Sequence, residues 1–312
     1  MTGKAEHVFA ALGGPARIVL QLADERLAAE IFAQAERIVR EFEAKYSRFR
    51  SDSLVGRINA ARGQAVPIDA EMARMLEIAH SLYEQSDGAF DATAGVLAEV
   101  WDFRGGRPPA RCDLAQALER VGWERVRWDA EHIRLGSLQK LDLGGIGKEF
   151  LVDKLVHFLR RSGVQSGVVD LAGDLCVLGP QSDGSAWRVG VSDPANPESA
   201  RYSLQLYHGA LCTSGDYQRG FEHEGQRLHH ILDARTGWPV TGPLRSVTVL
   251  STKATLAGAV CTLAMLYNAQ ACVWLGDSDL AWGAIDDEDV LHGPLTGPAP
   301  PGQASPYAEA AL

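Results

Sequence analysis

Hydrophobic residues recur at helical spacing in three long segments, residues 24–45, 70–85 and 148–162. Apolar positions three and four residues apart form one face of a helix, so each segment predicts an amphipathic helix with a buried side. Shorter helices are predicted up to Asn59 and over residues 113–120 and 254–267. The positions that define the long helices are Leu27, Ile31, Phe32, Ala35, Ile38, Val39 and Phe42, then Met72, Met75, Leu76, Ala79 and Leu82, then Val152, Leu155, Val156 and Leu159.

Short alternating or continuous apolar runs predict β-strands elsewhere in the chain. Residues 7–22 predict a strand pair around Gly13 and Gly14, and residues 131–143 predict two short strands. Further strands are predicted at residues 168–171, 176–178, 187–191, 203–207, 247–250 and 280–285. Because the long helices and the strand clusters occupy separate runs, the pattern indicates an α+β fold rather than a doubly wound sheet.

Length and composition are those of a globular protein with a sizeable core. The chain has 312 residues, 46% of them hydrophobic, which suffices for one large domain or two smaller ones. The segment from Gly293 onward is rich in glycine, proline and alanine and is predicted to be disordered. We therefore expect a single domain over residues 1–292 and a tail over residues 293–312.

Charge and cysteine content narrow the classes of function. A net charge of −10 argues against a nucleic-acid groove, which needs basic patches, but allows one small phosphorylated ligand in a local positive pocket. The five cysteines form no C-x-x-C pair, which disfavours structural zinc and indicates free thiols in a reducing compartment. Neither a signal peptide nor an apolar run of about 18 residues is visible. We expect no membrane span and a cytoplasmic location, or a periplasmic one if a leader has been removed.

The most informative segment, residues 141–153, reads Leu-Asp-Leu-Gly-Gly-Ile-Gly-Lys-Glu-Phe-Leu-Val-Asp. Asp142 lies in a short apolar run, Gly144 and Gly145 form a tight turn, and Lys148 stands at a predicted helix start. Glycines expose backbone amides, a helix N-terminus favours anions, and lysine adds a point charge suited to phosphate. The segment indicates either a phosphate-bearing ligand or an ordinary strand-to-helix turn with a solvated lysine. Its glycine spacing matches neither a Walker A loop nor the G-x-G-x-x-G fingerprint.

Two further segments place acids beside hydroxyls. Residues 90–95 bring Asp91 and Thr93 close to a glycine, an arrangement that is also typical of a helix N-cap. Residues 213–217 put two hydroxyls, Asp216 and Tyr217 within five positions, which fits a phosphate cradle or an Asx-turn. For both segments the sequence allows two interpretations, a ligand-binding site or a local capping or turn motif.

Residues 229–237 look most like a catalytic segment, because two histidines precede an acid and an arginine. A histidine near an acid is a candidate general base, although a histidine in an apolar strand is more often a packed core residue. Adjacent strand residues point to opposite faces, so only one of His229 and His230 faces a given site, which argues against joint zinc chelation. In the predicted helix 254–267, Gly258 and Thr262 share a face, as small residues in helix packing also do.

Taken together and in this order, these segments resemble the ApbE-like FAD:protein FMN transferases, the flavin transferase family. The matching segments are residues 9–13, 47–59, 90–93, 142–148, 173–174, 213–217, 230–237 and 247–262. The resemblance implies an α+β flavin transferase fold, with two similar halves around a central FAD cleft. It also implies an enzyme that binds FAD and Mg²⁺ and transfers FMN to a Thr or Ser hydroxyl of an acceptor flavoprotein, with release of AMP.

The same resemblance assigns roles to residues of this chain. His230 is implied as the base that activates the acceptor hydroxyl, and the carbonyl of Gly145 and the side chain of Thr262 are implied as metal ligands. A cation that neutralises phosphate and a base that takes the nucleophile's proton fit this chemistry. The residues implied to contact FAD are Leu12, Phe49, Ala89, Phe90, Asp91, Asp142, Lys148 and Ile231, with Phe49 in the place of a tyrosine and Leu12 in the place of a methionine.

One departure from the family pattern concerns the metal. The family has an aspartate four residues before the threonine equivalent to Thr262, and this chain has Gly258 there. Mg²⁺ prefers oxygen ligands that include one or two carboxylates. Three outcomes follow: Glu149 substitutes, FAD phosphates and waters hold a weaker ion, or the protein binds flavin without transfer. The alternatives to a transferase are therefore a non-catalytic FAD-binding protein or flavin maturation factor, and an FAD pyrophosphatase.

Overall fold

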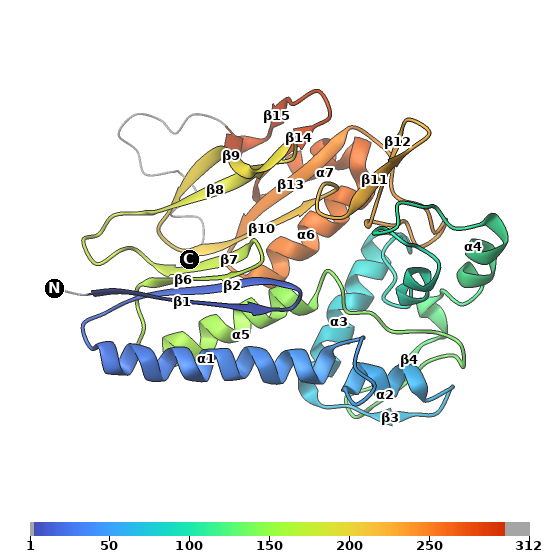
Figure 1. Ribbon diagram of the computed structural model, residues 1–312, viewed down its shortest axis with the longest axis horizontal. Coiled ribbons are helices and arrows are strands. Elements are labelled where there is room, and N and C mark those ends of the chain that lie inside the picture. The colour runs from blue at the N-terminus through green and yellow to red at the C-terminus, as the bar shows by residue number, and fades with distance from the viewer. Residues whose placement is uncertain (1–2, 297–312) are drawn as a thin grey trace.

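An eight-stranded antiparallel sheet forms the centre of the protein, whose computed structural model describes residues 3–296 (Figure 1). In spatial order the strands are β1 (Gly3–Ala11), β2 (Gly14–Leu22), β6 (Gly167–Leu171), β7 (Asp174–Gly179), β10 (Gly209–Gly215), β13 (Leu244–Ser251), β14 (Ala281–Asp286) and β15 (Leu291–His292). Each strand runs antiparallel to its neighbours. The pairing of β2 with β6 places the N-terminal hairpin beside strands from the second half of the chain.

Helices cover one face of this sheet and a β-hairpin covers the other (Figure 1). The helices are α1 (Glu25–Tyr46), α5 (Gly147–Arg161), α6 (Ala254–Tyr267) and α7 (Ala271–Gly276), and the hairpin is β8 (Trp187–Asp193) with β9 (Asn196–Leu206). Side chains alternate along β2, so Ile18 and Leu20 join the core under the helices while Val19 joins the core under the hairpin. With both faces covered, β7 is buried along its whole length.

A helical lobe formed by residues 54–134 lies beside the sheet (Figure 1). It contains α2 (Leu54–Ala60), α3 (Ala70–Gln85), α4 (Arg111–Leu118), the 3-10 helices η1 (Gly95–Glu99) and η2 (Trp123–Arg125), and a small sheet of β3 (Val66–Pro67), β5 (His132–Arg134) and β4 (Arg127–Trp128). A second hairpin is formed by β11 (Gly220–His223) and β12 (Gln226–His229). It packs on the helical lobe, where its Phe221 contacts Phe103.

The α+β fold is confirmed, and the three long helices lie within one residue of their predicted ranges. The prediction of two strands in residues 131–143 was wrong for the second one. Only His132–Arg134 forms a strand there, and Leu141 and Leu143 are buried without one. The amide of Asp142 instead donates to the carbonyl of Ala92 in the lobe. Apolar spacing alone therefore does not distinguish a strand from a buried loop.

The predicted tail begins inside the described part of the chain. The 3-10 helix η4 (Pro294–Thr296) follows β15, and its Leu295 is buried with the core under the β8–β9 hairpin. The rest of the predicted tail, residues 297–312, lies outside the described residues. The division into one domain and a tail stays a prediction.

One stretch of the described residues, 254–276, is apolar and long enough to cross a membrane, with a mean hydropathy of 1.5. This differs from the expectation that no run reaches membrane length. Half of the stretch is buried inside the protein, and η3 (Asn268–Gln270) separates α6 from α7. An apolar helix enclosed by its own protein is typical of a core, which explains the composition of α6.

Candidate functional site

The predicted site residues gather where several turns meet at one end of the main sheet. The β1–β2 turn lies against the β6–β7 turn, since the amide of Ala172 donates to the carbonyl of Pro15 at 2.9 Å. Asp174 begins β7 directly after that turn, and the amide of Thr213 on β10 donates to its Oδ1 at 3.2 Å. Lys148, in the first turn of α5, pairs with the same carboxylate. Distant parts of the chain thus converge on the N-terminus of α5.

The glycine turn before α5 brings three predicted site residues together. Gly145 has a φ of +79°, in the left-handed region that favours glycine. A Cβ placed on Gly145 would lie 3.4 Å from Oγ1 of Thr262 and 3.8 Å from Cε2 of Phe90. Phe90 from the lobe, Gly145 from the turn and Thr262 from α6 are therefore neighbours.

Asp142 is fixed by the same turn. Its Oδ1 accepts a hydrogen bond from the amide of Gly144 at 3.0 Å, and its Oδ2 pairs with Arg48 at 2.9 Å. The Arg48 guanidinium also lies 4.7 Å from the ring centroid of Phe49, which is 84% exposed and free to stack on a ligand. Arg48 thus joins two predicted FAD contacts. Sequence reasoning missed it because nothing in a polar turn distinguishes one arginine from another.

Lys148 is held by an ion pair rather than freely solvated. Its Nζ lies 2.6 Å from Oδ2 of Asp174, whose side chain is almost fully buried. Burial alone would lower the pKa of Lys148, but the negative charges of Asp174 and Glu149 raise it overall. Lys148 therefore stays protonated, with Asp174 balancing its charge, at a helix N-terminus, which favours anionic ligands.

Glu149 is a buried acid in the first turn of α5, with 7% of its surface exposed. Its Oε2 has no hydrogen-bond partner. Burial, together with the neighbouring Asp174 carboxylate, raises the pKa of Glu149. A Cβ added to Gly258 of α6 would overlap with Cγ of Glu149 and lie 3.1 Å from its Cδ. The glycine at position 258 therefore leaves the room that the Glu149 side chain occupies.

The two adjacent histidines at the end of the β11–β12 hairpin have different surroundings. His229 is buried, with Nε2 at 3.0 Å from the carbonyl of Val240, and its Nδ1 accepts the amide of Ile231 at 3.3 Å. Both ring nitrogens of His229 are therefore used inside the protein. His230 is half-buried, and its Nδ1 lies 3.3 Å from the carbonyl oxygen of Arg219. His230 is the histidine of this pair that keeps a ring nitrogen for a ligand.

The surroundings of His230 favour its neutral form. A carbonyl oxygen only accepts, so Nδ1 carries the proton toward Arg219 and Nε2 keeps its lone pair. Burial lowers the pKa of His230 to about 4, and the positive charges of Arg219 and Lys148 act in the same direction. A neutral imidazole with a free Nε2 is what a general base requires near neutral pH.

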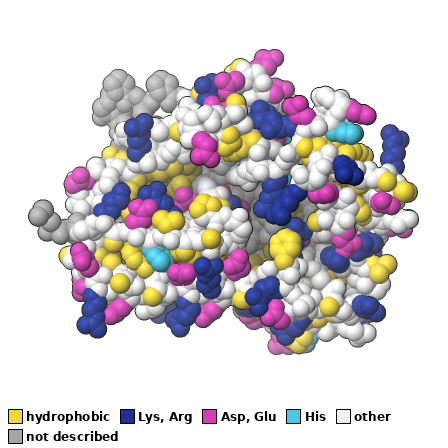
Figure 2. All heavy atoms as spheres, viewed as in Figure 1, with side chains coloured by type: hydrophobic (Ala, Val, Ile, Leu, Met, Phe, Trp, Pro, Cys, Tyr) yellow, Lys and Arg dark blue, Asp and Glu magenta, His cyan; other side chains and the backbone are white. Residues whose placement is uncertain are grey.

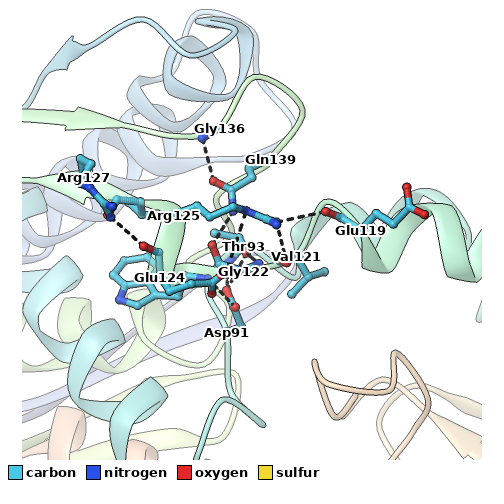
Figure 3. Close-up of polar contacts among 12 residues, drawn as sticks. Asp91, Thr93, Glu119, Val121, Gly122, Glu124, Arg125, Arg127, Gly136 and Gln139 are labelled. Carbon is cyan, nitrogen blue, oxygen red and sulfur yellow. Dashed lines mark hydrogen bonds and ion pairs between the residues drawn. The ribbon is translucent and has the colours of Figure 1, made fainter.

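Asp91 is engaged in internal hydrogen bonds (Figure 3). Its Oδ1 accepts from the amide of Thr93 at 2.6 Å and from the hydroxyl of Thr93 at 2.7 Å, and its Oδ2 accepts from the amide of Trp123 at 2.8 Å. The Thr93 hydroxyl in turn accepts the amide of Gly122 at 2.8 Å. The expected helix N-cap does not form, because the N-cap residue of η1 is Ala94 and it receives no side-chain hydrogen bond. The bonds of Asp91 instead close a local turn and fix the backbone beside Phe90. A contact between Asp91 and FAD stays a prediction.

The remaining predicted FAD contacts are anchored through their backbones. Leu12 has a φ of +53° in the β1–β2 turn, and its amide donates to a glutamate of α1 at 2.9 Å. An open groove of about 590 Å³ lies beside this turn. The carbonyl of buried Ala89 accepts from Ala234 at 2.9 Å, and the carbonyl of Ile231 accepts from Val240 at 3.0 Å. The bond from Ala234 ties the lobe to the segment that follows His230.

Residues 213–217 are held by internal contacts. Nε of Arg245 lies 3.0 and 2.9 Å from the two carboxylate oxygens of buried Asp216, and Nε of Arg227 lies 3.3 Å from Oδ2. The hydroxyls of Thr213 and Thr248 bond each other at 2.9 Å. Thr213 and Asp216 are thus engaged inside the protein, and phosphate binding by this segment stays a prediction. On the face of the molecule shown in Figure 2, Lys and Arg side chains gather near the middle, beside a hollow in the surface.

The oxygen atoms near the glycine turn are of mixed type. Within residues 3–296, no three His, Cys, Asp or Glu side chains cluster as a metal-binding group. The structure instead places Gly145 beside the Thr262 hydroxyl, and the Glu149 side chain against Gly258, one helical turn before Thr262. Such a set suits Mg²⁺, which takes few protein oxygens and completes its shell with water and phosphate.

Solved structures share this architecture. The crystal structure of the ApbE protein from Thermotoga maritima has a TM-score of 0.84 at 27% identity, and the match covers 93% of this chain and 97% of that one. The apo flavinyl transferase ApbE from Pseudomonas stutzeri has a TM-score of 0.84 at 26% identity, with coverage of 94% and 95%. The fold is therefore that of the ApbE flavin transferases.

Sequence comparisons agree with the structural ones. The FAD:protein FMN transferase of Klebsiella pneumoniae is 31% identical over 248 residues, which is 77% of this chain and 75% of the relative. The FAD:protein FMN transferase of Treponema pallidum is 33% identical over 264 residues, or 76% and 72%. The sequence profile of the ApbE family matches residues 12–281. The chain belongs to the ApbE family.

Proposed function

We propose that this protein transfers FMN from FAD to a Thr or Ser hydroxyl of an acceptor flavoprotein and releases AMP. The two relatives described above are named for FMN transfer from FAD to protein, and the chain covers about three quarters of each. The observation that carries the proposal within this chain is His230. Its imidazole is half-buried and neutral, with Nε2 free to accept a proton.

In the proposed reaction the acceptor oxygen attacks the phosphorus of the FMN half of FAD. The new P–O bond forms as the pyrophosphate P–O bond breaks, and AMP leaves with the electron pair of the bridging oxygen. Nε2 of His230 takes the proton of the acceptor hydroxyl. Lys148 supplies fixed positive charge for the phosphates, and the exposed ring of Phe49 provides a stacking surface for the flavin.

We further propose that the reaction depends on Mg²⁺. The carbonyl of Gly145 and the hydroxyl of Thr262 would hold the ion, because these two residues adjoin at the glycine turn. When bound, the ion neutralises phosphate charge and polarises the bond to the leaving group. The protein residues provide the fixed geometry, with Asp142 and Arg48 holding the turn in place.

The test is direct. The purified protein is incubated with FAD, Mg²⁺ and a small flavoprotein domain that carries an acceptor threonine, and covalent FMN is measured by mass spectrometry. We expect FMN on the acceptor and an equal amount of AMP, both lost in EDTA and in His230→Ala. His223→Gln is the matched control, because this histidine lies on the same hairpin with 43% of its side chain exposed. FMN and AMP without acceptor modification would indicate an FAD pyrophosphatase, and bound FAD without AMP a non-catalytic protein; either result refutes the proposal.

A further inference from the structure

We propose that the carboxylate of Glu149, from α5, is the side-chain carboxylate ligand of the metal ion at this site, in the space that Gly258 leaves on α6. The inference rests on the proposed function, because it concerns the ion used in FAD transfer. It is carried by three observations: a buried carboxylate oxygen without a partner, a glycine that makes room for it, and neutral oxygen donors in the adjoining residues.

The first observation is the unpartnered oxygen. Glu149 is 7% exposed, and within the described residues its Oε2 has no hydrogen-bond partner. A buried carboxylate without compensation disfavours the folded state, so buried acids are normally paired or bound to metal. The neighbouring Asp174 cannot stabilise an ionised Glu149, because the Asp174 carboxylate is itself negative and pairs with Lys148. The protein's own side chains thus leave Oε2 a vacant acceptor.

The second observation is the packing of α5 on α6. A Cβ at Gly258 would overlap with Cγ of Glu149 and lie 3.1 Å from its Cδ and 3.2 Å from its Oε1. Any side chain larger than that of glycine would therefore displace the Glu149 side chain. Glycine inside a helix is unfavourable by about 1 kcal/mol relative to alanine, so its presence here needs a packing reason. The position of Glu149 is that reason.

The third observation is the set of neighbouring donors. Thr262 follows Gly258 by one helical turn and lies on the same face of α6. Its Oγ1 adjoins Gly145, the last glycine of the turn before α5. A carboxylate from α5, a hydroxyl from α6 and the turn backbone therefore meet in one region. One carboxylate with neutral oxygens, completed by phosphate and water, is the kind of set that Mg²⁺ and Mn²⁺ take.

A structural role is the competing explanation. In that case Glu149 would keep a proton and share it with Asp174 as a buried acid pair, and metal affinity would be independent of Glu149. The positive charge of Lys148 does not decide between the two, since Asp174 already holds it at 2.6 Å. Metal affinity of the isolated protein separates the two explanations.

The experiment measures Mn²⁺ binding by electron paramagnetic resonance. The full chain is titrated with Mn²⁺ alone and then with equimolar ADP as a diphosphate, with ADP alone as the blank. We expect one saturable site in the wild type and at least about tenfold weaker binding in Glu149→Gln, which keeps the shape and removes the charge. The metal-free variant should be no less stable than the wild type, while its Mn²⁺-induced rise in Tm should disappear. Unchanged Mn²⁺ affinity in Glu149→Gln, or no saturable site in the wild type, overturns the proposal.

A pair of double variants tests the position of the carboxylate. Glu149→Ala with Gly258→Asp moves the carboxylate from α5 to α6, and Glu149→Ala with Gly258→Ala is the matched control. We expect the first to recover Mn²⁺ binding and the second not to; recovery in the control as well would overturn the proposal. Gly258→Asp alone should lower Tm, because the new side chain meets Glu149.

These readouts are independent of FMN transfer. Glu149-dependent Mn²⁺ binding in a protein that transfers no FMN would refute the proposed function and leave this inference standing. Metal-dependent FMN transfer with Mn²⁺ affinity that does not depend on Glu149 would refute the inference and leave the proposed function standing.

Discussion

The pH dependence of FMN transfer gives a sharp test of His230 as the base. We expect transfer to remain fast at pH values where an ordinary histidine has lost its base form. An unperturbed histidine has a pKa near 6.5, whereas burial lowers the pKa of His230 to about 4. The positive charges of Arg219 and Lys148 also oppose protonation of this imidazole.

The magnitude follows from the two pKa values. At pH 5.5 a histidine with a pKa near 6.5 is only about one-tenth neutral, whereas with a pKa near 4 it is roughly nine-tenths neutral or more. The value of kcat/KM at this pH should therefore be about tenfold above what an ordinary histidine permits, with half-loss near pH 4. The unfolded chain binds more protons between the two pKa values, so the free energy of unfolding should fall as the pH falls from about 6.5 toward 4.

The assay measures initial rates of covalent FMN attachment from about pH 3.5 to 8, with FAD below saturation so that kcat/KM reports the free enzyme. Circular dichroism at each pH verifies that the protein stays folded. His223→Gln should give the wild-type profile, because its side chain is 43% exposed and lies beside Glu224. Half-loss of kcat/KM near pH 6.5 would refute the reasoning, since the imidazole would then be solvated. Undiminished turnover in His230→Ala would place the base elsewhere.

Three further substitutions test single contacts. Asp91→Ala leaves two backbone amides and a hydroxyl without their acceptor and should lower the free energy of unfolding in urea by about 3 kcal/mol; a loss below about 0.5 kcal/mol would contradict a structural role of these bonds. Asp153→Ala removes the carboxylate that accepts the first amides of α6 and should lower the free energy of unfolding by about 1 kcal/mol in the same titration; an unchanged value would contradict capping by Asp153. Phe49→Ala should leave Tm unchanged, because the ring is 84% exposed, and raise KM for FAD several-fold; an unchanged KM would place the flavin elsewhere.

The long helices could be predicted because consecutive residues determine their burial. The start of α1 is an example, where Asp24 caps the helix and the apolar spacing begins directly afterwards. The strands were harder to predict. The residues of β7 are buried on both faces and show no alternation, and glycines and hydroxyls interrupt the pattern of β10, which was not predicted. Residues 141–143 are apolar because a loop is buried against the lobe, a tertiary effect that local spacing does not encode.

The candidate site could be predicted only where a residue type itself carries chemical information. Glycines before a helix and a histidine beside an acid are such cases, and they marked residues 141–153 and 229–237. The resemblance to the flavin transferases then implied the roles of Gly145 and His230. The partners that fix these residues could not be predicted, because they come from distant elements of the assembled sheet. Asp174 pairs with Lys148, and Arg219 orients the His230 ring, yet neither is near its partner in a recognisable motif.

Gly258 and Glu149 show why such residues must be interpreted as a pair. Taken alone, Gly258 indicates the loss of a metal ligand, and Glu149 is an unexplained acid at a helix start. Each is unfavourable by itself, since glycine weakens a helix and a buried carboxylate needs a partner. In the structure the glycine makes room for the carboxylate, so each residue accounts for the other. The cost that remains is the unpartnered Oε2 of Glu149, and a bound cation would remove it. The argument for a non-catalytic protein rested on Gly258 alone, and it weakens once the carboxylate is found one helix away.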